Sequence, residues 1–136
     1  MFAMNSVYLR YSSIHSLDSS KLDQLINLGR DIDEDVLGQL LGVHKETSEL
    51  ILNDMRKFFT EKNYAELKRC AHKYKSSSAN LGLIKLQKLC ADLETKLGQA
   101  ATFNHDEYNQ IFEFIDSITF ESHQTSLKLN SYGKVA

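Results

Sequence analysis

An apolar pattern with a period of about 3.6 residues runs through most of this chain, and none of its 136 residues is a proline to interrupt it. Leucine, isoleucine and other apolar residues recur three and four positions apart, which is the signature of amphipathic helices. Proline is the residue that helix interiors tolerate least, so its absence fits long helices. The sequence therefore predicts an all-α protein.

The composition restricts the class of function. With 42% hydrophobic and 25% charged residues, the chain has the make-up of one soluble globular domain that can bury a core. A net charge of −2 argues against nucleic-acid binding, which needs a clustered basic surface. No stretch approaches the ~18 apolar residues of a membrane span, and the first residues lack the pattern of a secretory signal. We expect a cytoplasmic protein that binds neither nucleic acid nor membrane.

Capping and breaking signals bracket five helices. The first is short and runs from Ser20 to Gly29, and the others span about 33–63, 63–80, 84–97 and 104–126. Short loops favour antiparallel neighbours, so the four long helices should form an up-down-up-down bundle over residues 19–126, with the short helix as a lid. Residues 1–18 and 127–136 are predicted to be loosely structured tails. The predicted core includes Leu40 and Phe112, and Cys70 and Cys90 are predicted to be buried thiols.

One histidine lies away from the apolar stripe of its helix. At about 100° per residue, the stripe takes in Leu67, Cys70, Ala71, Tyr74, Ser78 and Leu81. His72 falls outside that arc, beside Lys68, Lys75 and Ser76, because residues three and four apart share a helix face. An exposed imidazole flanked by ammonium groups suits a phosphoryl group that a partner brings, and the two lysines would neutralise its oxygens. The alternative is a solvated basic face without a function.

The segment from Ala71 to Glu94, AHKYKSSSANLGLIKLQKLCADLE, closely resembles the signature of histidine-containing phosphotransfer domains. The resemblance extends upstream over residues 22–47 and weakly downstream to Ile118. It implies that His72 is the phosphorylated histidine and that Glu94 holds the imidazole from a neighbouring helix. Glu94 could then accept a hydrogen bond from the non-reacting ring nitrogen; an exposed glutamate near a helix end is the alternative. The departure is Ser76, where most members carry glycine, and we expect serine to serve as a small, hydrogen-bonding substitute.

The resemblance implies a phosphorelay intermediate. Such a protein takes a phosphoryl group from the aspartate of one receiver domain onto His72 and passes it to the aspartate of another receiver. The expected partners are the receiver domains of a hybrid sensor histidine kinase and of a response regulator. Magnesium is expected on the receivers and no cofactor on this chain, which we expect to be a monomer.

Two rival functions remain beside this interpretation. No ATP-binding motif is present, so we expect a carrier without kinase activity of its own. A non-catalytic helical adaptor that binds a receiver domain or a partner helix is the rival function, and a metal-binding bundle is a more distant one, because the ExxH spacing of di-iron bundles is absent. His44 lies on the apolar seam of the long helix, where a packed histidine is a better interpretation than a second phosphoacceptor.

Overall fold

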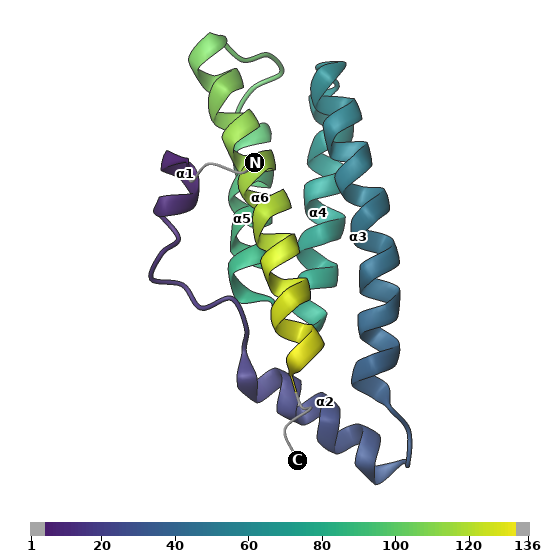
Figure 1. Ribbon diagram of the computed structural model, residues 1–136. Helices are drawn as coiled ribbons and strands as arrows, with labels where there is room; N and C mark the ends of the chain where they lie inside the picture. Colours follow the sequence, from purple (N-terminus) through teal and green to yellow (C-terminus); the bar gives the residue numbers. More distant parts are fainter. Residues whose placement is uncertain (1–4, 133–136) are drawn as a thin grey trace.

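The computed structural model describes residues 5–132 of the chain. Over that range every regular element is a helix, which confirms the all-α prediction. The helices are α1 (Ser6–Leu9), α2 (Ser19–Asp31), α3 (Val36–Thr60), α4 (Tyr64–Asn80), α5 (Ile84–Leu97) and α6 (His105–Ser131). Figure 1 shows α3, α4, α5 and α6 running alternately up and down, with α2 lying across one end.

Polar caps define where the helices begin. The Asn63 side chain accepts a hydrogen bond from the Glu66 amide at 3.3 Å at the start of α4. At the start of α6, Asn104 and Glu107 form a complete capping box, as their spacing predicted. The first predicted helix begins slightly earlier than expected, at Ser19, because the Asp18 carboxylate caps it by accepting from the Lys21 amide.

The core lies between the four long helices, and all four contribute buried apolar side chains to it. Its fully buried side chains include Leu67 and Tyr74 of α4 and Leu86, Leu89 and Leu93 of α5. Two residues of the predicted core are exposed instead: Leu40 by 36% and Phe112 by 53%. In α6 the buried face includes Phe114 in place of Phe112, because the N-terminal segment packs on that side of the helix.

The N-terminal segment was wrongly predicted to be a loose tail. Val7, Tyr8 and Tyr11 are buried, and α1 packs against α6 (Figure 1). The Tyr8 hydroxyl donates to the buried Glu121 carboxylate at 2.7 Å, and the Tyr11 hydroxyl donates to Asp92 of α5. Burial and the Glu121 hydrogen bond raise the pKa of Tyr8, so this hydroxyl stays a donor throughout the physiological range.

The last helix ends later in the sequence than predicted. Helix α6 continues past 126 to Ser131, and Leu129 is buried on it. The hydroxyl of Tyr132 donates to the Asp23 carboxylate at 2.9 Å and so joins the end of α6 to α2. Residues 1–4 and 133–136, the outermost parts of the two predicted tails, lie outside the described residues.

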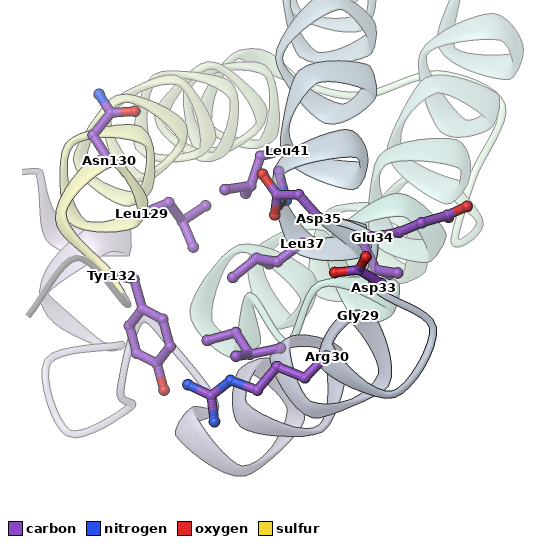
Figure 2. Close-up of a pocket in the computed structure, with 13 residues that line it drawn as sticks. Gly29, Arg30, Asp33, Glu34, Asp35, Leu37, Leu41, Leu129, Asn130 and Tyr132 are labelled. Atoms are coloured by element: carbon purple, nitrogen blue, oxygen red, sulfur yellow. Dashed lines mark hydrogen bonds between the residues drawn. The ribbon is translucent and has the colours of Figure 1, made fainter. Parts of the chain in front are cut away.

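A pocket of about 620 Å³ opens where α2, the start of α3 and the end of α6 meet. Figure 2 shows Arg30 and Tyr132 on one side of it and Asp35 and Leu37 on another. A second pocket of about 570 Å³ follows the seam between α3 and α6 and shares Leu41 with the first. Neither pocket has a lining residue from α4 or α5, so neither contains His72.

The turn between α4 and α5 yields a stability prediction. Gly82 has a φ of +67°, and a Cβ on it would stand 2.9 Å from the Cβ of Lys21. We expect Gly82→Ala to lower the free energy of unfolding by about 1–3 kcal/mol, because it adds both a backbone strain and a clash with α2. Urea denaturation monitored by circular dichroism measures the effect.

The matched control is Gly42→Ala. Gly42 lies inside α3, and a Cβ there meets nothing within 4 Å. This substitution should raise the free energy of unfolding by up to ~1 kcal/mol through helix propensity. Equal destabilisation by the two substitutions would contradict the assignment of strain to the Gly82 turn.

Candidate functional site

His72 lies at the middle of α4, on the outer wall of the bundle. Its side chain is 59% exposed, whereas Ala71 and Tyr74 on the same helix are fully buried. The apolar stripe of α4 packs against α3 and α5 and therefore directs the imidazole into solvent. The position agrees with the helical periodicity of the sequence.

Glu94 of α5 connects the imidazole to a lysine. One carboxylate oxygen, Oε2, lies 2.7 Å from Nδ1 of His72, and the other, Oε1, accepts from Nζ of Lys75 at 2.6 Å. Residues 72 and 75 lie one turn apart on α4, so a single carboxylate from the neighbouring helix reaches both. The structure thus brings together three of the residues singled out in the sequence.

These contacts keep the carboxylate ionised. Partial burial by itself raises the pKa of Glu94, but the hydrogen bonds from Lys75 and His72 outweigh burial and hold the pKa below its ordinary value. An ionised carboxylate can only accept hydrogen bonds, so Nδ1 of His72 must carry a proton. In the neutral ring the other nitrogen, Nε2, then bears the lone pair, on the exposed side chain.

The two remaining predicted site residues, Ser76 and Lys68, do not take part in the contact between His72, Glu94 and Lys75. Ser76 is exposed one turn after His72 on the same face of α4. The ammonium group of Lys68 lies against Gly98 at the end of α5, 3.3 Å from where a Cβ would stand on that glycine. A cation there interacts favourably with the helix C-terminus, so Lys68 also helps to hold α5 against α4.

The sequence analysis missed a cluster of hydroxyl groups on the buried side of α4. The Tyr74 hydroxyl is hydrogen-bonded to Ser48 of α3 at 2.9 Å and to Ser122 of α6 at 2.5 Å. The three buried hydroxyl groups therefore satisfy one another and fix the position of α4 relative to both helices. Serines within the apolar stripes of α3 and α6 were the available signal for this cluster.

His44 is a packed core histidine, as the sequence indicated. It is 6% exposed, its ring stacks on Tyr74, and its Nδ1 lies 3.0 Å from the Ser77 hydroxyl. Both cysteines, Cys70 and Cys90, are buried free thiols. Within residues 5–132, no group of three or more His, Cys, Asp and Glu side chains is placed to hold a metal ion.

The same part of the chain contains no helix long and apolar enough to cross a membrane.

Comparison with known protein families identifies the family of this chain. The family model of the Hpt domain matches residues 39–117, more than half of the chain. Multistep phosphorelay regulator 1 of Schizosaccharomyces pombe is 30% identical over 78 residues, which are 57% of this chain. The match spans 26% of that relative, so the chain corresponds to about a quarter of its length.

A solved structure shares the fold. The crystal structure of a rice protein described as a histidine-containing phosphotransfer protein superimposes with a TM-score of 0.67. The superposition covers 93% of this chain and 92% of the rice chain at 16% sequence identity. At that identity the likeness concerns the fold alone.

The burial of His44 predicts how stability depends on pH. Burial lowers the pKa of His44 below 6.5, so the folded protein keeps this ring neutral while the unfolded chain binds a proton at about pH 6.5. Stability from this residue is therefore present above pH 6.5 and is lost as the pH falls below it. Urea denaturation between pH 7.5 and 5 should show this loss.

The variant His44→Phe separates the contribution of His44 to the pH dependence of stability from the contribution of the carboxyl groups. Its free energy of unfolding should fall less steeply with pH than that of the wild type in the same range. Identical slopes in the two proteins would show that His44 titrates normally in the fold.

Proposed function

This chain belongs to the Hpt domain family, and on that premise we propose that it carries phosphoryl groups between receiver domains in a phosphorelay, with His72 as the acceptor. The observation that carries the proposal is the exposed imidazole whose Nδ1 is bound by Glu94. That contact leaves Nε2 as the nucleophile and holds the ring in one orientation toward solvent. A solvated helix face without a function would not need a contact that fixes the tautomer and the orientation of the imidazole.

The surroundings of the ring suit the incoming group. Lys75 places positive charge one turn from His72, near a phosphoryl group on Nε2, and Ser76 offers a hydroxyl donor on the same face. Serine in place of the usual glycine keeps this face small. We propose that the partner receiver supplies the aspartate and the magnesium ion and that this chain has no kinase activity of its own.

The distribution of exposed apolar side chains indicates where a receiver would dock. Of eight large apolar side chains that are exposed among the described residues, four belong to α2 and α3 and a fifth, Ile32, caps the end of α2; the four are Leu28, Leu40, Val43 and Leu50. Lysines and polar groups surround His72 itself, so the apolar part of an interface must lie beside it. Interfaces commonly have an apolar centre with a polar rim.

Val43 and Leu50 lie on the flank of α3 that adjoins α4. The opposite flank of α3, with Leu41 and Leu52, lines the seam toward α6, and neither Val43 nor Leu50 lines it. Burial raises the pKa of the Cys70 thiol on α4, and the charge of Asp54, one helical turn after Leu50, raises it further, so this flank of α3 faces α4. We propose that a receiver domain covers His72 and this flank of α3 together.

Substitution of the proposed acceptor tests the function. His72→Gln should abolish uptake of label from a phosphorylated receiver, because glutamine has no nucleophilic ring nitrogen. Transfer of ³²P and the acid lability of the label identify the phosphohistidine. Helicity and the melting temperature should stay nearly unchanged, since an exposed side chain contributes little to stability.

Acid-labile labelling that persists in His72→Gln would contradict the assignment of the acceptor. A wild-type chain that binds the phosphorylated receiver without taking up label would be a non-catalytic adaptor instead.

The docking surface can be tested by a pair of double variants. Val43→Gln with Leu50→Gln should lower kcat/KM for transfer by about tenfold or more, which corresponds to ~1.4 kcal/mol of lost interface energy. Phe112→Gln with Leu127→Gln is the matched control, because these α6 side chains are 53% and 54% exposed and lie outside the proposed surface. A larger loss in the control pair would place the receiver on another face.

A further inference from the structure

The group that holds the ring of His72 is a charged carboxylate, although a neutral acceptor would orient the ring equally well. Lys75 binds its second oxygen at 2.6 Å and keeps it ionised. Given the proposed function, on which this inference rests, the charge of Glu94 affects the ring of His72 once it is phosphorylated.

Uptake of the phosphoryl group requires no proton transfer. The lone pair of Nε2 attacks phosphorus of the receiver's aspartyl phosphate, the P–O bond to the aspartate breaks, and the electron pair leaves with the aspartate oxygen. The proton on Nδ1 stays where Glu94 already holds it. The product is a phosphorylated imidazolium whose ring is positively charged.

Delivery is the reverse of this step. A carboxylate oxygen of the second receiver attacks phosphorus, the P–N bond breaks, and the electron pair returns to Nε2. If Nδ1 still carries its proton, neutral imidazole is the leaving group. If the proton has been lost, the leaving group is the far more basic imidazolate, and transfer is slow.

The charges around the ring act in opposite directions. Two of them are in contact: Glu94 from α5 binds Nδ1 of the ring, and Lys75 from α4 binds Glu94. Two further lysines of α4 are exposed: Lys68 lies against Gly98, and the charge of Lys73, like that of Asp54 on α3, acts on Cys70. The lysines favour loss of the Nδ1 proton by like-charge repulsion. Glu94 is in direct contact with that nitrogen and favours its retention.

We propose that Glu94 is a positioning residue that keeps the proton on Nδ1 of His72 through both transfer steps, so that the domain delivers its phosphoryl group rapidly instead of storing it. Lys75 supports this role by neutralising the second oxygen of Glu94 without removing its charge. The carboxylate touches no atom of the phosphoryl group and acts only through the ring.

Glu94→Gln tests the proposal, because the amide oxygen still accepts from Nδ1 but carries no charge. The full chain is phosphorylated with potassium phosphoramidate, and the pKa of the phosphorylated ring is measured by ³¹P and ¹⁵N NMR. We expect the ring pKa to fall by about one unit in Glu94→Gln, as expected when a contacting opposite charge is removed. Glu49→Gln, an exposed carboxylate lining the seam between α3 and α6, is the matched control and should leave the ring pKa unchanged.

The rate of delivery to a receiver gives the second measurement. Above both ring pKa values, delivery from Glu94→Gln should be about tenfold slower than from the wild type, because its protonated fraction is about tenfold smaller. Below both values, the two rates should agree. The phosphorylated form of Glu94→Gln should also hydrolyse more slowly near neutral pH.

An unchanged ring pKa, or an equal loss of rate at every pH, would overturn the proposal, since the second result is what a merely structural residue would give. Failure of the wild-type chain to take label from a phosphorylated receiver would instead overturn the proposed function. The ring titration uses phosphoramidate and no receiver, so it decides the role of Glu94 in either case.

Discussion

The structure depends on the packing of α4, because one side of this helix lies in the core and the other side lies in solvent. Leu67, Ala71, Tyr74 and Ser78 are fully buried on one side, whereas the other side carries an imidazole into solvent at the same level of the bundle. The phenol of Tyr74 alone fixes α4 to two other helices through hydrogen bonds. A rotation of α4 that buried His72 would break these bonds and expose the stripe, so the core itself holds the reactive group at the surface.

The contact between α4 and α5 at Glu94 contributes little to stability, because His72 is exposed and solvent still reaches the partly buried Glu94 and Lys75. Ion pairs of this kind are worth about 0–1 kcal/mol, far less than the burial of one leucine of the same helix. The contact is nevertheless specific, since two donors from α4 converge on one carboxylate. Its consequences therefore concern the ring of His72: the tautomer, the orientation, and the charge after phosphorylation.

The predictable parts of this molecule are those governed by local periodicity. The helical wheel of α4 placed His72 outside the core, and the capping pattern at Asn104 and Glu107 is present in the structure. Glu94 lies 22 residues from His72, so no local pattern could pair them, and the family resemblance supplied the expectation. The N-terminal segment was missed for a related reason: Tyr8 bonds to a residue 113 positions away, and a helix of four residues shows no periodicity.

The two long faces of the bundle differ in a way that fits a carrier. On the seam between α3 and α6 the helices are loosely packed and leave an open pocket, yet no residue of that pocket belongs to α4. On the side of α4 and α5 the packing is closer and every predicted site residue belongs to one of these two helices. A phosphoryl acceptor gains from the second arrangement, because a rigid helix presents Nε2 in the same geometry to successive partners without a loop to order at each encounter. The partners can then differ, provided that each fits the same exposed ring and the apolar flank of α3 beside it.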